Sequence, residues 1–179
     1  MDDPKVFKLW QDGNTIGIFQ FESQGMTNFM KELKPDCLED IIAGVSLYRP
    51  GPMDQIPRYI ANKKDPEHAV YTHPSLKPIL KVTYGCMVYQ EQVMQIVRDL
   101  AGYSLGRADL VRRAMGKKKL DVMAKERENF VHGKTDENGN IEIKGCVRNG
   151  IDEASANKIF DEMAEFAKYA FNKSHAACY

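Results

Sequence analysis

The amino-acid sequence predicts a mainly α-helical fold with minor β-strand pieces. Apolar side chains recur at the three-and-four spacing of a buried helix face in several segments, and capping residues or Gly and Pro breaks bound those segments. Hydrophobic residues make up 43% and charged residues 28% of the 179 positions, which is ordinary for a globular protein. A chain of this length can build one domain or two small subdomains around a real core.

The first third predicts one strand and two helices. Residues 16–21 read as a short strand, and Ser23 is the predicted N-cap of the helix that follows. Asp36 and Glu39 resemble a capping box that opens a second helix. This helix must end near Tyr48, because the Arg49-Pro50-Gly51-Pro52 run cannot continue it. The apolar faces predicted for these helices are Met26, Phe29, Met30 and Leu33 in the first, and Leu38, Ile41, Ile42 and Val45 in the second.

The middle of the chain predicts a short helix over 53–64, a surface loop over 65–75, a second β piece over 82–89 and two further helices. The first of these two helices is expected to bury Val93, Ile96 and Leu100 and to end at Gly102, with Gln92, Gln95 and Arg98 in water. The second is expected over 106–115, with Leu110 and Ala114 on one side.

The last third predicts a helix over 121–131, a polar insertion and a final long helix. The insertion, 133–146, contains Asn138-Gly139 before an apolar-polar alternation and reads as a small surface hairpin. Asp152 is the predicted N-cap of the final helix. The stripe predicted for this helix is Ile159, Met163, Phe166 and Ala170.

Positive charge is concentrated in residues 107–127. This stretch holds eight basic and three acidic side chains, a net of +5, in a chain whose formal net charge is zero. Basic residues near a helix C-terminus also complement the helix dipole, and most short basic runs are solvated faces. The adjacent pair Arg112-Arg113 favours phosphate binding, since guanidinium groups grip phosphate in bidentate fashion.

Two other basic positions allow a structural and a functional interpretation. Arg49 sits either on a rigid proline corner or in a place where the prolines aim it at a phosphate. Lys173, Ser174 and His175 are close enough for a nucleophile and base, but no third group is evident to orient them. Lys173 and His175 as further phosphate-facing donors fit the rest of the chain better.

The sequence offers no catalytic residue and no metal site. Two-metal phosphoryl chemistry needs close carboxylates on a rigid element, whereas Asp2-Asp3 lie at the terminus and Glu39-Asp40 at a helix start. The four cysteines are widely spaced, so neither a zinc site nor a disulfide framework is indicated. We therefore expect reduced thiols and a cytoplasmic location, with no secretory signal and no membrane partner.

Several motifs together resemble the C-family replicative polymerases, in particular the bacterial DNA polymerase III α subunit of the DnaE type. The resemblance covers essentially the whole chain in order. The motifs that carry it are Ile18 to Ser23 with Gly25-Met26, Tyr48 to Pro52, Thr83-Tyr84-Gly85, Tyr89 to Met94, Leu110 to Lys119, and Phe171 to His175. The chain departs from the family's usual glycines at Lys168 and Ala170.

The resemblance implies that residues 1–179 are a helical fingers-domain fragment of a larger DNA-directed DNA polymerase, with 84–119 as its central nucleotide-binding stretch. It implies partners in DNA template-primer, a deoxynucleoside triphosphate and the palm and thumb of the same polypeptide. The sliding clamp and other replisome subunits would bind through regions outside this sequence. Mg²⁺ would be held by palm aspartates, also outside it, so that this fragment binds no cofactor and is inactive alone.

The resemblance also assigns roles to individual residues. Those implied to bind nucleotide are Arg112, Arg113, Lys173 and His175, and those implied to bind DNA are Arg49, Arg107, Lys117, Lys118 and Lys119. The competing hypothesis is a non-enzymatic helical module that binds nucleic acid or protein. A binding affinity of the chain that depends on nucleoside triphosphate would favour the polymerase hypothesis, and an affinity indifferent to it would favour the interaction module.

Overall fold

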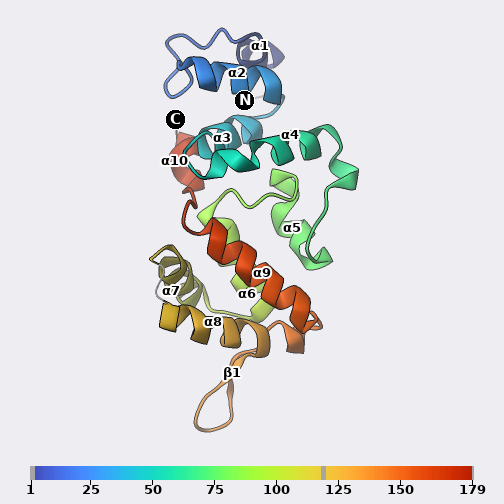
Figure 1. Ribbon diagram of the computed structural model, residues 1–179, viewed down its shortest axis with the longest axis vertical. Helices are drawn as coiled ribbons and strands as arrows, with labels where there is room; N and C mark the ends of the chain where they lie inside the picture. The colour runs from blue at the N-terminus through green and yellow to red at the C-terminus, as the bar shows by residue number, and fades with distance from the viewer. Residues whose placement is uncertain (1–2, 118–119, 179) are drawn as a thin grey trace.

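The computed structural model describes residues 3–117 and 120–178, and in these residues the fold is mainly α-helical, as predicted (Figure 1). The α-helices are α1 (Pro4–Asp12), α2 (Gln24–Leu33), α3 (Leu38–Leu47), α4 (Ile56–Lys64), α5 (Lys77–Leu80), α6 (Gln90–Ala101), α7 (Leu105–Gly116), α8 (Leu120–His132), α9 (Glu153–Phe166) and α10 (Lys173–Cys178). Short 3-10 helices are η1 (Pro52–Gln55), η2 (Pro66–His68), η3 (Pro74–Leu76), η4 (Lys81–Thr83) and η5 (Val147–Asn149). The two strands are β1 (Lys134–Thr135) and β2 (Ile141–Ile143).

The helices form two lobes along the long axis of the molecule (Figure 1). The upper lobe contains α1 to α4 and α10, and the lower lobe contains α5 to α9 and the hairpin. Each lobe has its own cluster of buried apolar side chains. The largest fully buried members are Met30, Leu47, Tyr59 and Tyr89 in the upper cluster, and Leu76, Ile96, Met115, Phe130, Ile143, Phe160, Ile159 and Met163 in the lower cluster.

Two segments cross between the lobes and touch each other. Residues 84–89 leave the lower lobe, place Cys86, Val88 and Tyr89 in the upper cluster, and return as α6. Residues 167–172 lead from α9 to α10. The crossing segments meet in a single parallel bridge between Tyr89 and Phe171, in which the Gln90 N–H donates to the Phe171 carbonyl at 2.9 Å.

The predicted helix ends are confirmed at three places. Ser23 accepts a hydrogen bond from the Met26 N–H at 3.3 Å, and Asp152 accepts one from the Ser155 N–H at 2.8 Å. Gly102 ends α6 in the left-handed conformation, with φ of 78°. Glycine adopts the left-handed conformation readily because it has no Cβ to clash with the backbone.

The predicted hairpin is also confirmed. Strands β1 and β2 pair antiparallel, and the Asp136 carboxylate accepts from the backbone N–H groups of Asn138 and Asn140. The backbones at its base are so close that a Cβ on Gly145 would lie 2.4 Å from the Gly133 nitrogen. The hairpin projects from the end of the lower lobe (Figure 1).

Both β pieces predicted elsewhere are wrong. Residues 16–21 form turns, with Gln20 at a φ of 67°. Residues 82–83 belong to η4, and residues 84–89 form a turn and an irregular stretch apart from the Tyr89 bridge. Phe21, Val88 and Tyr89 reach the upper core from loops, whereas Ile16, Phe19 and Val82 are exposed, so these apolar residues do not mark paired strands. Helix α1, by contrast, was not predicted at all, although Asp3 caps it at 2.9 Å and Gly13 ends it.

Several details within the predicted helices also need correction. Helix α3 begins after Cys37 and has no side-chain cap. The Asp36 N–H donates to Asp40 Oδ2 at 3.2 Å, and the Asp36 carboxylate pairs with Lys63 Nζ at 3.0 Å. Leu38, predicted to be buried, is 39% exposed. In α7 the exposed side chain is Leu110, while the residues buried are Ala108, Val111 and Met115. Helix α9 ends at Phe166, so Ala170 lies beyond it.

Candidate phosphate-binding site

In the last two turns of α7, two guanidinium groups bind the same carboxylate. Asp109 Oδ1 accepts from Arg112 Nη2 at 2.7 Å, and Asp109 Oδ2 pairs with Arg113 Nε at 2.8 Å. These pairs use the three- and four-residue spacings that bring helix side chains together. The hydrogen bond from Arg112, with the charge of Arg113 beside it, holds the pKa of Asp109 below its usual value.

This arrangement leaves a net positive charge in a defined place. The Arg113 side chain is 62% exposed and the Arg112 side chain 24%. One carboxylate compensates one of the two guanidinium groups, and it also fixes their directions. A phosphate that approached here would meet a pair of planar donors that are already oriented.

The end of α7 packs against the end of α9. A Cβ on Gly116 would lie 3.4 Å from the Ala167 carbonyl, at the start of the crossing segment 167–172. The arginine pair therefore lies close to the segment that leads to α10. Lys117 follows as an exposed C-cap residue of α7, and the predicted Lys118 and Lys119 lie outside the described residues.

Arg107, at the other end of α7, is engaged within the lower lobe. Its Nη2 lies 2.6 Å from Glu126 Oε1, and its Nη1 lies 3.5 Å from Glu142 Oε1 on β2. Glu126 is buried and also accepts from the Tyr103 hydroxyl at 3.1 Å. Burial and this neighbouring carboxylate raise the pKa of Tyr103. Arg107 thus links α7 to α8 through the buried Glu126 and to β2 through the exposed Glu142.

Arg49 binds the second crossing segment. Its Nη2 donates to the Tyr169 carbonyl at 2.8 Å, its Nε donates to the Ser46 carbonyl at 3.0 Å, and its guanidinium lies 4.4 Å from the centre of the Phe171 ring. The proline corner therefore directs Arg49 onto residues 120 positions later in the sequence.

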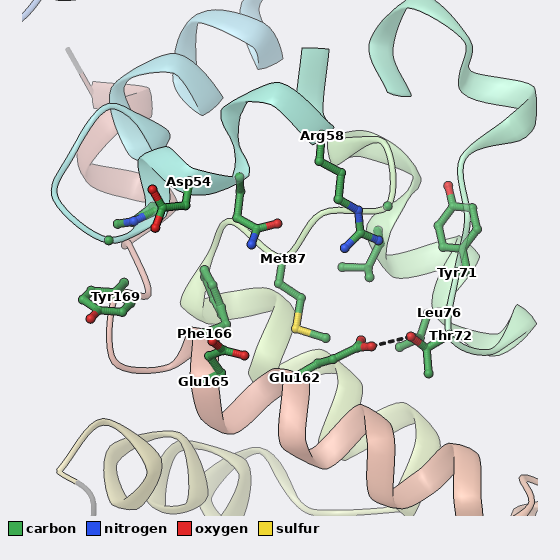
Figure 2. A pocket seen from close by; sticks show the side chains of 15 residues that line it. Asp54, Arg58, Tyr71, Thr72, Leu76, Met87, Glu162, Glu165, Phe166 and Tyr169 are labelled. Carbon is green, nitrogen blue, oxygen red and sulfur yellow. Dashed lines mark hydrogen bonds between the residues drawn. The ribbon is translucent and has the colours of Figure 1, made fainter. Parts of the chain in front are cut away.

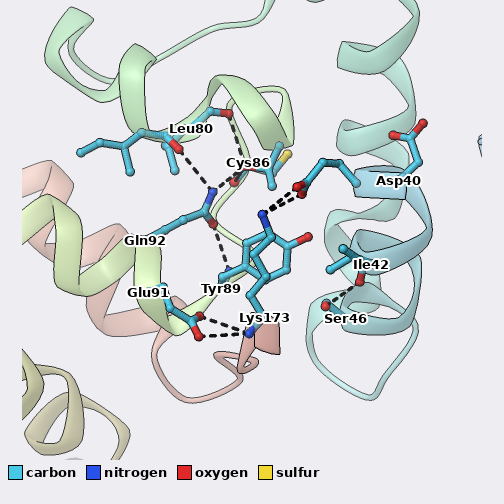
Figure 3. Close-up of polar contacts among 12 residues, drawn as sticks. Asp40, Ile42, Ser46, Leu80, Cys86, Tyr89, Glu91, Gln92 and Lys173 are labelled. Carbon is cyan, nitrogen blue, oxygen red and sulfur yellow. Dashed lines mark hydrogen bonds and ion pairs between the residues drawn. The ribbon is translucent and has the colours of Figure 1, made fainter. Parts of the chain in front are cut away.

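Lys173 and His175 lie on α10, on the other side of Phe171. Lys173 Nζ lies 2.9 Å and 2.8 Å from the two carboxylate oxygens of Glu39, and 5.3 Å from the centre of the Tyr89 ring. Its backbone N–H faces the Glu91 carboxylate (Figure 3). The His175 ring meets the Phe171 ring edge-on, with centroids 5.4 Å apart.

The predicted site residues thus fall into two groups. Arg49, Lys173 and His175 gather around Phe171, whereas Arg112 and Arg113 lie on α7, which packs against the far end of the same segment. The carboxylates that hold Arg112, Arg113 and Lys173 were not among the predicted site residues. The spacing of Asp109 to both arginines was visible in the sequence. Glu39 and Glu91 gave no such signal, because they lie 134 and 82 residues from Lys173.

A separate cavity of about 410 Å³ lies between the lobes, beside both crossing segments (Figure 2). Its walls include Met87 and Tyr169 from those segments, and Arg58 points into it from α4. Three carboxylates, Asp54, Glu162 and Glu165, line it with that single arginine. The excess of negative charge makes it unsuited to a phosphate group.

One group of side chains has a spacing that could hold a metal ion. Among the described residues, Asp36, Cys37 and Asp40 bring ligand atoms within 4.8 Å of one another. Lys63 Nζ, however, lies 3.0 Å from Asp36 and 3.2 Å from Asp40. An internal ammonium group already balances these carboxylates, so the set does not fit a Mg²⁺ ion, which needs oxygen ligands without a competing cation.

The chain is therefore a two-lobed helical domain that presents oriented arginine and lysine side chains around a crossing segment. This defines a class of helical domains with clustered, oriented basic side chains. Within the described residues, no helix combines the length and the apolar character needed to cross a membrane. The four cysteines are all free thiols.

Comparison with known proteins identifies the family. A family model described as the bacterial DNA polymerase III alpha subunit finger domain matches residues 1–138. DNA polymerase III subunit alpha of Chlamydia trachomatis is 52% identical over 179 residues, which are 100% of this chain and 14% of that protein. The same subunit of Thermus aquaticus is 52% identical over 184 residues, with the same coverage. That of Staphylococcus aureus is 48% identical over 178 residues, or 99% of this chain and 16% of that protein.

The chain belongs to the finger-domain family of the bacterial DNA polymerase III alpha subunit. It spans about a seventh of the length of the curated relatives that it matches.

Proposed function

We propose that this chain is the fingers part of a replicative DNA-directed DNA polymerase. In the complete polymerase it would bind the incoming deoxynucleoside triphosphate and part of the template-primer. The names and identities of the relatives support this activity, and the distribution of charge on α7 and α10 supports the binding role. The palm and thumb of the same polypeptide would be its partners, with the sliding clamp and other replisome subunits bound elsewhere on that polypeptide, in the cytoplasm.

The observation that carries the proposal is the pair of guanidinium groups on Asp109. We propose that Arg112 and Arg113 bind the triphosphate and stabilise charge that grows on the leaving pyrophosphate. Lys173 and His175 would face the same nucleotide across the crossing segment. Mg²⁺ would be held by palm carboxylates outside this sequence, and it would supply Lewis-acid chemistry there. The described residues offer cations for this nucleotide and no ligand set for the metal.

We propose that the DNA-binding surface comprises Arg49, Arg107 and Lys117 together with Lys118 and Lys119. Lys117 is exposed and faces solvent at the end of α7. Arg49 and Arg107 also hold parts of the fold together, through the Tyr169 carbonyl and the Glu126 carboxylate. Their removal is therefore expected to reduce stability as well as DNA affinity.

The test is kinetic and uses the complete polymerase. Arg112→Ala or Arg113→Ala should each weaken kcat/KM for nucleotide by on the order of 2–4 kcal/mol, with part of the loss in kcat. Arg→Lys should recover little, because an ammonium group cannot reproduce the planar fork. Arg98→Ala is the matched control, since Arg98 is an exposed helical arginine whose Nε lies 2.8 Å from Asp99.

Single-turnover incorporation measures nucleotide use, and DNA titration measures affinity for the duplex. Primer-template affinity should change much less than nucleotide use. If both alanine variants weakened DNA binding and left incorporation at saturating nucleotide unchanged, the triphosphate assignment would be wrong. Binding that is indifferent to triphosphate in all variants would instead favour a non-enzymatic interaction module.

A further inference from the structure

Glu91 makes a contact that neither the sequence pattern nor the family name explains. It is the second residue of α6, and both of its carboxylate oxygens lie 3.2 Å from the backbone nitrogen of Lys173. Lys173 is the first residue of α10. A carboxylate at the start of one helix therefore accepts the first backbone N–H of another (Figure 3).

The residues beside Glu91 fix the same bend of the chain. The Gln90 N–H donates to the Phe171 carbonyl at 2.9 Å, and Tyr89 pairs with Phe171 in the parallel bridge. The start of α6 thus determines where the backbone lies two residues before α10 and again at its first residue. These contacts do not involve the Lys173 side chain.

A different carboxylate orients that side chain. Glu39, on α3, binds Lys173 Nζ, and the ammonium group also lies over the Tyr89 ring. The backbone of Lys173 is therefore bound by α6 of the lower lobe, and its side chain is bound by α3 of the upper lobe. The Lys173 side chain remains 33% exposed.

We infer that Glu91 is a positioning residue for nucleotide use, acting through Lys173. The inference rests on the proposed function, because the position of Lys173 matters to nucleotide only if its ammonium group faces it. A carboxylate that accepts a backbone N–H makes a charge-assisted hydrogen bond, stronger than a neutral one. Small displacements of a binding group lower reaction rates steeply. Loss of Glu91 should thus displace Lys173 without removing any group that contacts nucleotide or DNA.

The first experiment compares Glu91→Ala and Glu91→Gln in the complete polymerase. Glu91→Ala should raise the KM for nucleotide about tenfold, as expected for the loss of a hydrogen bond to a charged group, with a smaller change in kcat. Glu91→Gln should recover most of this loss, because its amide oxygen can still accept the Lys173 N–H. Glu32→Ala, which removes an exposed carboxylate from α2, is the matched control and should leave KM unchanged.

The second experiment asks whether Glu91 acts through Lys173. In the Lys173→Ala background, Glu91→Ala should raise KM by less than about twofold, because the group that it positions is already absent. A general structural defect would instead multiply the effects of the two substitutions. Primer-template affinity of Glu91→Ala should stay within about twofold of the parent.

The outcomes separate this inference from the proposed function. A KM unchanged by Lys173→Ala would overturn the nucleotide role of Lys173 and with it the role of Glu91, while the role of Arg112 and Arg113 is decided by their own variants. A KM raised by Lys173→Ala but not by Glu91→Ala, or effects that multiply, would overturn the role of Glu91 alone. Should Glu91→Ala fail to fold, Glu91→Met takes its place, because it keeps most of the side-chain length but lacks a strong acceptor. Faster amide hydrogen exchange at Lys173 together with a raised KM supports the inference, and unchanged values overturn it.

Discussion

Gln92 is a polar side chain predicted to face water that is instead 5% exposed. Its Oε1 accepts from the backbone N–H groups of Val88 at 2.8 Å and Tyr89 at 3.0 Å. Its Nε2 donates to Thr83 Oγ1 at 2.8 Å and to the Ile79 carbonyl at 3.5 Å. One side-chain amide thus satisfies the backbone of an irregular segment that has no strand partner for most of its length.

We expect Gln92→Ala to destabilise the fold by about 2–4 kcal/mol, because two buried backbone N–H groups lose their acceptor. Urea denaturation of the parent and the variant measures the difference. Gln95→Ala, a partly exposed glutamine one turn later on α6, is the control and should cost less than about 0.5 kcal/mol. Equal losses for the two variants would contradict the role given to Gln92.

Two of the acidic residues around the predicted nucleotide cations, Asp109 and Glu91, differ in how far the sequence reveals them. Asp109 could be predicted as a partner of Arg112 and Arg113, since side chains three and four residues apart share a helix face. Glu91 could not, because its partner becomes a neighbour only when the crossing segments meet. The contact of Asp109 follows from local sequence spacing, whereas the contact of Glu91 exists only in the tertiary fold.

Helices and their ends were the most predictable elements. Ser23, Gly102 and Asp152 mark ends by local chemistry, which acts within a few residues of the cap. The predicted strands failed for the opposite reason, because a strand needs a partner elsewhere in the chain. Residues 16–21 and 82–89 place Phe21, Val88 and Tyr89 in the upper core without forming strands, whereas the hairpin, whose partner strand is local, formed as predicted.

The cap of α9 gives a prediction about pH. Hydrogen bonds from the Ser155 side chain and backbone lower the pKa of Asp152. A lowered pKa means that the cap contributes stability above the usual aspartate value, about 3.9, and loses it as pH falls through the lower folded-state value. Asp152→Asn keeps an acceptor but does not titrate, so its stability should fall less steeply below about pH 4.

Urea midpoints measured from about pH 6 to pH 2 test this prediction. Glu137→Gln removes an exposed carboxyl group from the hairpin and serves as the control. The prediction is wrong if Asp152→Asn and the parent lose stability in parallel over this range.

At the scale of the whole molecule, the lobes are joined by the crossing segments and by Arg49. Its guanidinium group donates to the Tyr169 carbonyl and lies over the Phe171 ring. Arg49 therefore attaches the upper lobe to the segment that follows α9. We expect Arg49→Ala to speed amide hydrogen exchange in residues 167–172 by about tenfold, while the cores of both lobes stay protected.

Hydrogen exchange resolved by peptide gives the measurement, and Arg98→Ala, which removes an exposed arginine paired with its own neighbour, gives the control. Faster exchange throughout both lobes would show that Arg49 supports global stability. No change at residues 167–172 would show that the crossing segment does not depend on it.

The route of the chain through the lobes has a consequence for folding during synthesis. The buried residues of the lower core all come from positions 76–167, one continuous stretch. The upper core, in contrast, needs Tyr89 from the first crossing and Ala176 from α10. A ribosome that makes the chain from its N-terminus therefore releases α1 to α4 long before their last packing partner exists. Because distant contacts must wait for the intervening chain, we expect the lower lobe to fold autonomously and the upper lobe to reach its native state only after α10 has emerged.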